Sequence, residues 1–309
     1  MVQQTTIQRP FKLSGRGLHT GLNVEVNILP APADSGILFR RTDMGTPVDI
    51  PALATMVSDT SRGTTIASNG ARIATVEHLM SALHGMQIDN AVVEVGGEEI
   101  PILDGSARLW VEGIRNVGIQ QLQQPRKVFR LEQPLRISND SGMEIQALPA
   151  PEFKVSTIID FKSEVIGHQE AELTGYDSYA DEVAPSRTFV LLHEIEPLLA
   201  NNLIKGGDLD NALVFVDHKL QPDNLENLAR LFGKDLKSIK VRNGVLNNID
   251  KYFPNEPARH KMLDFIGDIA LAGMRVQAHF IIKCPGHKAN NEFARLLQQH
   301  IAEHNTSLK

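Results

Sequence analysis

One short segment, residues 259–268, carries side chains that could bind a metal ion. If it forms a helix, His260, Asp264 and Asp268 follow one another at four-residue intervals and fall within about 80° of one face, at ~100° per residue. An imidazole and a carboxylate one turn apart can reach the same ion, and nitrogen–oxygen ligation of this kind suits zinc. The alternative is an amphipathic helix whose polar stripe is solvated and holds only a weak ion pair.

A second candidate is the pair of neighbours Glu77 and His78. Adjacent residues diverge by about 100° around a helix, so the two would not normally bind one ion together. If His78 bound a metal, Glu77 could instead act as a base on a nearby water molecule, which is the division of roles in zinc hydrolases. His84 falls near the apolar side of the same segment and is expected to be a core or capping residue.

A third candidate, His287, follows Cys284-Pro285-Gly286. Alternating apolar residues over 276–282 predict a strand that the proline and glycine end. His287 would then lie on a loop at a strand end, a common place for a catalytic side chain, and a surface histidine is the alternative. Cys284 is expected to be buried within the strand. As the single cysteine it excludes an intrachain disulfide bond.

The elements that would position these residues come from two halves with similar patterns. Alternating polar and apolar residues followed by Leu-Pro-Ala-Pro occur at 24–32 and at 143–151, and alternation resumes at 37–39 and 155–159. Such alternation predicts half-buried strands joined by a turn. We therefore expect an internal duplication, with chance similarity as the alternative. The polar residues 120–127 would form the linker.

Both halves also contain segments with helical spacing. Val76, Met80 and Leu83, for example, recur at the three- to four-residue interval of a packed helix. Strands before helices in each half predict an α+β fold rather than a doubly wound parallel sheet. The unusually apolar residues 189–216 are interpreted as an insertion in the longer second half. Helices are expected over residues 74–86, 106–117, 224–232, 257–273 and 291–304.

The composition is that of an ordinary globular protein, with 309 residues, 42% hydrophobic and 22% charged. The net charge of −6 gives no basic surface for nucleic acid. We find no signal peptide and no apolar stretch near the roughly 18 to 20 residues of a membrane-spanning helix. A cytoplasmic enzyme or binding protein is therefore expected.

Taken together with other motifs, these segments resemble one family, the UDP-3-O-acyl-N-acetylglucosamine deacetylases of lipid A biosynthesis. The resemblance extends over nearly the whole chain, and the motifs follow one another in the right order. They are Gly-Leu-His-Thr-Gly at 17–21, Asp59-Thr60, Glu77-His78, Pro-Ile-Leu-Asp-Gly-Ser at 101–106, Arg-Thr-Phe at 187–189, Arg-His-Lys through Leu-Asp at 259–264, Gly267-Asp268 and Gly286-His287.

The resemblance implies an α+β fold of two β-α-α-β domains, residues 1–125 and 128–309, packed as a layered sandwich with the active site between them. It also implies that the insertion at 189–216 forms a passage for the acyl chain of a nucleotide-sugar substrate. An interaction surface, or core beneath a loop, is the alternative for that segment. A monomer is expected.

Roles for single residues follow from the same resemblance. It implies that His78, His260 and Asp264 hold one Zn²⁺ per chain, with Fe²⁺ as the alternative. The reaction would be hydrolysis of an N-acetyl amide with release of acetate. The remaining assignments are Glu77 as general base, His287 as cationic partner or general acid, Asp268 as the group that positions it, Thr188 as a holder of the oxyanion, and Lys261, His19, Phe161 and Phe189 on the substrate side, with Lys261 and Thr188 also counted as catalytic.

Two rival functions remain open at the level of sequence. A non-catalytic binding protein could keep a structural metal, but such zinc sites normally have four protein ligands. The other rival is a zinc hydrolase with a different class of substrate, such as a peptidase, although the His-Glu-x-x-His pattern of many metallopeptidases is absent. The chain departs from the family pattern at Gly63, Ser186 and Lys162-Ser163. These departures bear on substrate contacts and acyl-chain length rather than on the reaction.

Overall fold

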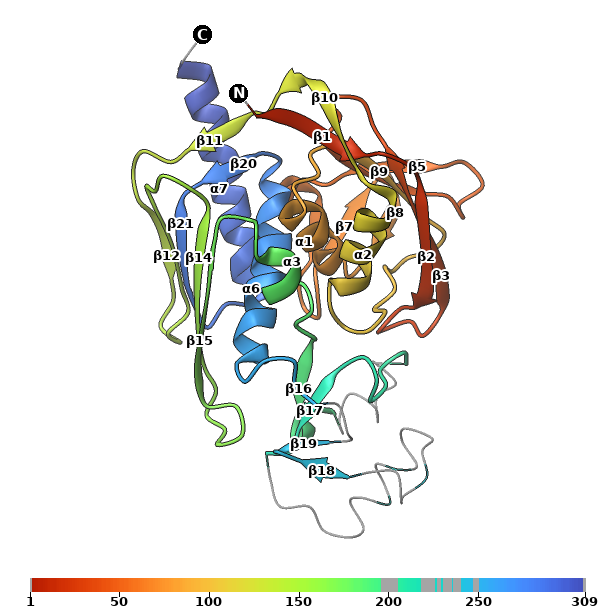
Figure 1. Ribbon diagram of the computed structural model, residues 1–309, viewed down its shortest axis with the longest axis vertical. Coiled ribbons are helices and arrows are strands. Elements are labelled where there is room, and N and C mark those ends of the chain that lie inside the picture. Colours follow the sequence, from red (N-terminus) through yellow and green to blue (C-terminus); the bar gives the residue numbers. More distant parts are fainter. Residues whose placement is uncertain are drawn as a thin grey trace.

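The computed structural model describes residues 2–195, 205–217, 226, 229, 235, 240–246 and 250–307. Figure 1 shows helices enclosed between two large sheets, and each of these sheets has five strands. The mixed α+β class expected from the sequence is confirmed. None of the described helices is long and apolar enough to span a bilayer.

The first sheet has the strand order β2-β3-β9-β4-β5. Strands β4 and β9 run parallel, and the other neighbours are antiparallel. Along β3 the residues Val24, Val26 and Ile28 are buried in alternation with more exposed ones, so the period-two sequence pattern becomes a half-buried strand. The strands are β2 (Phe11–Arg16), β3 (Asn23–Pro30), β9 (Ala91–Val95), β4 (Ile37–Arg41) and β5 (Val48–Pro51).

The second sheet has the strand order β12-β13-β21-β14-β15. Strands β14 and β21 run parallel, and the other neighbours are antiparallel. Neighbour by neighbour, this is the same arrangement of strand directions as in the first sheet. The strands are β12 (Leu135–Ser138), β13 (Glu144–Leu148), β21 (His279–Lys283), β14 (Lys154–Asp160) and β15 (His168–Thr174).

Helices α1 (Glu77–Gly85) and α6 (Glu256–Ile269) pack against each other between the two sheets (Figure 1). Every residue of α1 is buried. The two backbones approach closely at Gly267, where an added Cβ would lie 2.0 Å from the carbonyl oxygen of Glu77. Only a glycine permits this approach. Around the pair lie α2 (Arg108–Val117), α3 (Tyr179–Glu182), α7 (His287–Ser307) and the 3-10 helices η1 (Ala54–Met56) and η3 (Ala270–Ala272).

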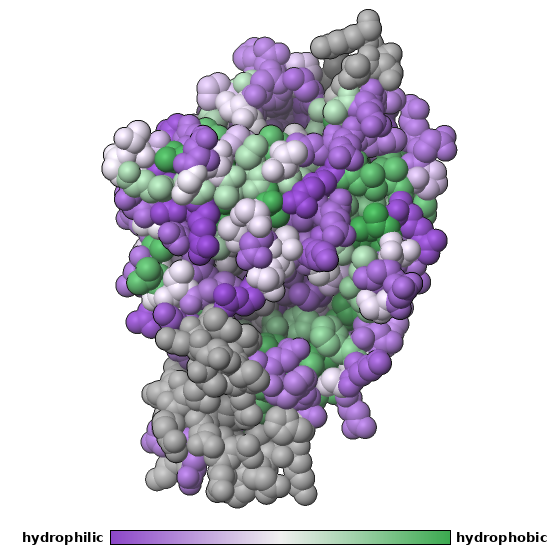
Figure 2. Space-filling model, turned by 180° about the vertical axis from the view of Figure 1, so that it is seen from behind, coloured by the Kyte–Doolittle hydropathy of each residue, from purple (hydrophilic) through white to green (hydrophobic). Residues whose placement is uncertain are grey.

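Shorter strands form further small sheets. One of them, with the order β16-β17-β19-β18, lies at the lower end of the molecule in Figure 1 and has a small apolar cluster of its own. Figure 2 shows several separate groups of hydrophobic residues on a face that is otherwise mainly hydrophilic, one of them in the lower half and another at the right of the upper half. The strands are β1 (Gln3–Ile7) with β10 (Ile119–Pro125), β6 (Val57–Asp59) with β7 (Thr65–Ser68) and β8 (Ala71–Ile73), β11 (Val128–Arg130) with β20 (Arg275–Gln277), and β16 (Phe189–Leu191), β17 (Leu213–Phe215), β18 (Val241–Arg242) and β19 (Val245–Leu246).

Two strand predictions are wrong in detail. Most of the expected linker, residues 120–127, lies in β10, which pairs with β1. Strand pairing uses only backbone groups, and the side chains of β10 are largely exposed. Its polar residues therefore show no alternation of apolar and polar residues from which a strand could be predicted. The expected strand over 276–282 is two strands in different sheets, because the chain passes from β20 to β21 at Ala278. Cys284 is exposed rather than buried, since it follows the end of β21 and has a φ of 45°.

The helix boundaries also differ from the predicted ones. Helix α1 begins at Glu77, because Thr75 has a φ of 59°, which a right-handed helix cannot contain. Helix α7 begins at His287, four residues earlier than the expected 291. The helix expected over 224–232 lies almost wholly outside the described residues.

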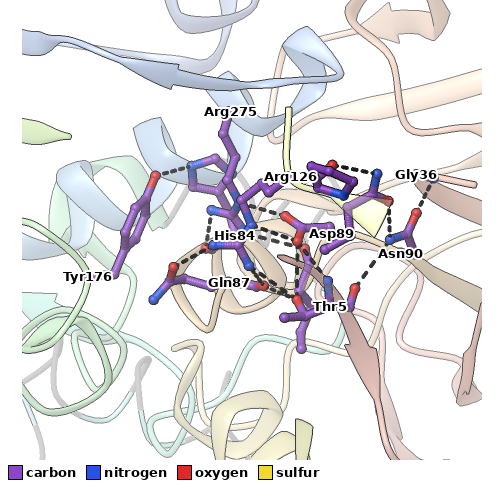
Figure 3. A network of polar contacts seen from close by, with 12 residues as sticks. Thr5, Gly36, His84, Gln87, Asp89, Asn90, Arg126, Tyr176 and Arg275 are labelled. Carbon is purple, nitrogen blue, oxygen red and sulfur yellow. Dashed lines mark hydrogen bonds and ion pairs between the residues drawn. The ribbon is translucent and has the colours of Figure 1, made fainter. Parts of the chain in front are cut away.

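A polar network at the C-terminal end of α1 joins the two halves (Figure 3). The carboxylate of Asp89 accepts hydrogen bonds from the guanidinium groups of Arg126 and Arg275, each at 2.8 Å. Arg275 also donates to the carbonyl oxygen of His84, and Arg126 to that of Gln87, each at 3.0 Å. The two arginines thereby tie the last turn of α1 and the residues that follow it to β20 and to the end of β10.

His84 belongs to this network and not to the site of the other histidines. It is 8% exposed, and its Nε2 lies 3.2 Å from the hydroxyl of Tyr176. Burial, followed by the charges of Arg275 and Arg126, holds the pKa of His84 well below its usual value. The expectation that His84 is a core residue is confirmed.

Candidate metal centre and catalytic site

Three buried side chains from α1 and α6 converge between the sheets. The ligand atoms of His78, His260 and Asp264 all lie within 4.8 Å of one another. Oδ1 of Asp264 is 3.5 Å from Nε2 of His78 and 3.4 Å from Nε2 of His260. His260 and Asp264 are each 2% exposed, so the alternative of a solvated polar stripe is wrong.

The donor atoms of this cluster fit a metal ion. Oδ1 of Asp264 is buried and accepts no hydrogen bond from any residue that the structure describes, which is costly for a charged oxygen. Nδ1 of His260 donates to the carbonyl oxygen of Ser186 at 3.0 Å, so the neutral ring presents an unprotonated Nε2 to the cluster. Two imidazoles and one carboxylate are a set of zinc ligands that leaves a coordination position open.

Burial and charge keep these groups in the protonation states that bind metal. Burial lowers the pKa of His260 to about 3, so the ring is neutral. Burial by itself would raise the pKa of Asp264, but the cationic groups of Lys261 and His287 and the adjacent His260 ring hold it well below its usual value. The ammonium group of Lys261 also donates to Oδ2 of Asp264 at 3.0 Å, which leaves Oδ1 facing the two imidazoles.

Glu77, the first residue of α1, lies beside this cluster and faces a different partner. Glu77 is 3% exposed, with Oε1 at 4.0 Å from Nε2 of His287 and Oε2 accepting the N–H of Thr64 at 2.9 Å. Burial raises the pKa of Glu77, and a raised pKa makes a carboxylate a stronger base. Because neighbouring residues diverge around a helix, His78 faces His260 and Asp264, whereas Glu77 faces His287.

His287 is not on a loop, as the sequence suggested, but opens helix α7. Its Nδ1 donates to Oδ2 of Asp268 at 3.0 Å, and its Nε2 lies 3.9 Å from Oδ2 of Asp264. Burial lowers the pKa of His287, but the carboxylates of Asp268, Asp264 and Glu77 outweigh this effect and raise it to about 9. The ring is therefore a cation at neutral pH, close to the base and to the candidate metal ligands.

Three of the expected substrate residues meet at the edge of this cluster. The ring of Phe189 packs against the rings of Phe161 and His260, with centroids 5.5 and 6.3 Å apart. The ammonium group of Lys261 lies 5.4 Å from the centroid of Phe189. Phe161 and Lys261 also line a cavity of about 180 Å³ together with Cys284. An aromatic and cationic wall therefore adjoins the candidate metal ligands.

The other two expected substrate residues are connected to the cluster through neighbours. Thr188 lies between Ser186, the acceptor for His260, and Phe189, and its N–H donates to the carbonyl oxygen of Gly105 at 2.7 Å. His19 reaches the carbonyl oxygen of Arg62 through Nε2 at 3.1 Å. The structure thus places each of them next to a segment that contacts the cluster.

Sequence reasoning missed a buried carboxylate that holds the loop of His19. Glu99 is fully buried and accepts hydrogen bonds from the N–H groups of His19 and Thr20, each at 2.9 Å, and from the hydroxyl of Thr20 at 2.8 Å. Nothing in its local sequence distinguishes it from an exposed glutamate. Its partners lie about 80 residues away and are brought to it by the fold.

Sequence reasoning also missed an ion pair formed by the residue that precedes Thr188. Arg187 and Glu256 are almost completely buried, and Nε of Arg187 lies 2.8 Å from Oε1 of Glu256. The same carboxylate oxygen accepts the N–H of Arg187 at 3.1 Å. The pair therefore ties the segment of Thr188 to the first turn of α6.

Comparisons with known proteins agree with this geometry. The family described as LpxC, UDP-3-O-acyl N-acetylglycosamine deacetylase, matches residues 4–230 and 233–299. The chain is 41% identical over 305 residues to the bifunctional enzyme LpxC/FabZ of Porphyromonas gingivalis, covering 98% of this chain and 66% of that protein. It is 39% identical over 302 residues to the UDP-3-O-acyl-N-acetylglucosamine deacetylase of Nitratidesulfovibrio vulgaris, covering 96% and 88%. The chain therefore spans just under two thirds of the first of these relatives.

Proposed function

Because the chain belongs to the LpxC family of UDP-3-O-acyl N-acetylglycosamine deacetylases, we propose that it removes the N-acetyl group of UDP-3-O-acyl-N-acetylglucosamine and releases acetate, a step of lipid A biosynthesis. One structural observation is the main support for this proposal. Three buried metal ligands converge from two helices, with a carboxylate and a cationic imidazole beside them.

We propose Zn²⁺ as the ion, held by His78, His260 and Asp264, with Fe²⁺ as the alternative. When bound, zinc activates a water molecule and polarises the carbonyl group of the amide. Three protein ligands favour a catalytic over a structural site, because structural zinc normally has four. This count, and the presence of Glu77 beside the site, argue against a non-catalytic binding protein.

The side chains around the ligands would perform the proton transfers. Glu77 would accept a proton from the attacking water, as its burial and raised pKa allow. Negative charge then develops on the amide oxygen, and the His287 cation, positioned by Asp268, together with the hydroxyl of Thr188, would stabilise it. The leaving nitrogen would receive its proton from His287 or from Glu77. The His287 cation is therefore present in the folded protein before the substrate binds.

The substrate would lie against the wall formed by Phe161, Phe189 and Lys261, with His19 on the nucleotide-sugar side. Support comes from the contacts of Phe189 with Phe161 and Lys261 and from the adjoining cavity. We propose that the insertion at 189–216 carries the acyl chain. In the described residues, one side of its strands packs with a small apolar cluster and the other side with the main core.

We further propose that the two halves, residues 1–125 and 128–309, are β-α-α-β domains that arose by duplication. The support is the shared order and direction of strands in the two large sheets. The ligands then come from both domains, with His78 from the first and His260 and Asp264 from the second. A monomer and a cytoplasmic location remain predictions.

The test compares two variants with the wild type. Glu77→Gln is expected to keep its metal and to lose about 10²–10⁴ of its turnover, because the amide cannot accept the proton. His260→Ala is expected to lose the metal itself. Metal content is measured by elemental analysis and turnover by acetate release from the UDP-linked substrate. Wild-type activity in either purified variant, or metal-loaded wild type that releases no acetate, refutes the proposal.

A further inference from the structure

One threonine is hydrogen-bonded to two of the carboxylates of the site. Thr64 immediately precedes β7 and is fully buried. Its N–H donates to Oε2 of Glu77 at 2.9 Å, and its hydroxyl donates to Oδ1 of Asp268 across 204 positions of sequence. Backbone and side chain of a single residue therefore join the proposed base to the carboxylate that positions His287.

Asn291 fixes the direction in which the Thr64 hydroxyl points. Its Nδ2 donates to Oγ1 of Thr64 at 2.9 Å and also to the carbonyl oxygen of His287 at 2.8 Å. Because an amide N–H can only donate, Oγ1 accepts this bond, and its own proton is directed to Oδ1 of Asp268, which accepts it. The chain of bonds thus has one consistent direction, from the amide through the hydroxyl to the carboxylate.

The other carboxylate oxygen of Asp268, Oδ2, is held by residues of α7. Oδ2 accepts bonds from Nδ1 of His287 at 3.0 Å and from Nδ2 of Asn290 at 2.9 Å. Both donors belong to α7. Thr64 contributes the bond to Oδ1 from the first half. The orientation of the carboxylate, and through it that of the His287 ring, therefore depends on both halves.

We propose that Thr64 is a positioning residue that fixes the base Glu77 and the His287–Asp268 pair relative to each other, with Asn291 directing its hydroxyl. The inference rests on the proposed function, because it assumes that Glu77 and His287 act on the same substrate. Thr64 acts through the two carboxylates and is not itself a catalytic residue. A 4.0 Å separation between Oε1 of Glu77 and Nε2 of His287 is the geometry that it would maintain.

The experiment removes the hydroxyl without changing the shape of the side chain. Thr64→Val is expected to lower kcat about 10- to 100-fold, the usual effect of removing a group that orients a ligand or catalytic residue. KM is expected to stay within about twofold, because no substrate contact of the wall formed by Phe161, Phe189 and Lys261 is altered. Thr64→Ser restores the hydroxyl and is expected to recover most of kcat. Asn291→Ala is expected to lower kcat by a smaller factor.

Thr157→Val is the matched control. Thr157 is fully buried, and its hydroxyl has no hydrogen-bond partner among the described residues, so the same substitution there should leave kcat and KM unchanged. Metal content is measured in every variant and is expected to match the wild type. Equal losses in Thr157→Val and Thr64→Val, an unchanged kcat in Thr64→Val, or a serine variant as slow as the valine variant would each overturn the inference.

A second readout does not depend on activity. In metal-free protein, the proton on Nδ1 of His287 that is bonded to Asp268 is followed by NMR and assigned with His287→Ala. Thr64→Val is expected to shift or broaden this resonance, and Thr157→Val and Thr64→Ser to leave it in place. An unshifted resonance in Thr64→Val contradicts the positioning role. If wild type releases no acetate, the proposed function fails, while this measurement still decides for or against the inference about Thr64.

Discussion

Gly267 sets how closely α1 and α6 can approach, and replacing it with alanine tests whether the metal cluster needs that approach. A Cβ at this position would lie 2.0 Å from the carbonyl oxygen of Glu77 and 2.8 Å from its carbonyl carbon. Nonbonded contacts of carbon become favourable only near 3.5 Å, so the two backbones must separate by about 1–1.5 Å. The separation occurs beside Glu77 and His78 on one helix and between Asp264 and Asp268 on the other.

A displacement of this size is large on the scale of metal coordination. Ligand distances must hold to within about 0.2 Å, so we expect Gly267→Ala to bind zinc at least tenfold more weakly. Misplacement by 1 Å can cost about 10²-fold in rate, which sets the expected loss of turnover. Helix propensity would by itself stabilise alanine by about 1 kcal/mol, whereas overpacking costs about 1–3 kcal/mol. The net expectation is a free energy of unfolding lowered by up to about 2 kcal/mol.

The assays are zinc competition against a chelator, acetate release, and denaturant unfolding of metal-free protein. Gly96→Ala serves as the control, because an added Cβ there meets only the carbonyl oxygen of Glu25 at 3.6 Å, an ordinary contact. It should leave all three measurements unchanged. The reasoning is refuted if Gly267→Ala binds zinc as tightly as wild type and unfolds at the same or a higher denaturant concentration.

Three further predictions concern charge and pH. His287→Ala is expected to flatten the alkaline limb of the pH–rate profile, because the raised pKa of His287 supplies a cation that is lost as pH rises; an unchanged profile would contradict its charge role. His84 is held neutral by a depressed pKa, so the unfolded chain takes up a proton below about pH 6.5 that the folded chain does not, and stability should fall with decreasing pH by up to ~1.4 kcal/mol per unit. Denaturant unfolding at pH 7.5 and 5.5 should show a smaller decrease in His84→Gln, and an equal decrease would count against this linkage. Arg187→Met leaves Glu256 buried without its partner and is expected to cost about 3–5 kcal/mol in thermal or denaturant unfolding, with part of the loss recovered in Arg187→Met/Glu256→Gln; no loss would show that the pair is not needed.

Local patterns predicted much of the fold. Alternation over 24–30 and 155–159 became β3 and β14, and the apolar spacing around Met80 became α1. These patterns succeed because each element buries one side, and the burial leaves a period in the sequence. They failed for β10, whose side chains are mainly exposed and leave no such period. The turn from β20 to β21 was missed as well, because a single buried alanine does not interrupt the apolar alternation.

The sequence by itself predicted which residues form the candidate metal cluster. The four-residue spacing of His260 and Asp264, the neighbours Glu77 and His78, and the resemblance to family motifs led to the prediction of His78, His260 and Asp264 as ligands. Spacing along one helix depends only on local geometry, so the order of the residues is enough to predict which side chains share a face.

Only the tertiary structure decided how these residues meet and what holds them. It brings His78 within 3.5 Å of Asp264, buries both, and places Thr64 between Glu77 and Asp268. The lowered pKa of His260 follows from this burial, and the raised pKa of His287 follows from the carboxylates of Asp268, Asp264 and Glu77 around it. Contacts between residues almost 200 positions apart depend on the packing of α1 against α6, which no local period in the sequence encodes.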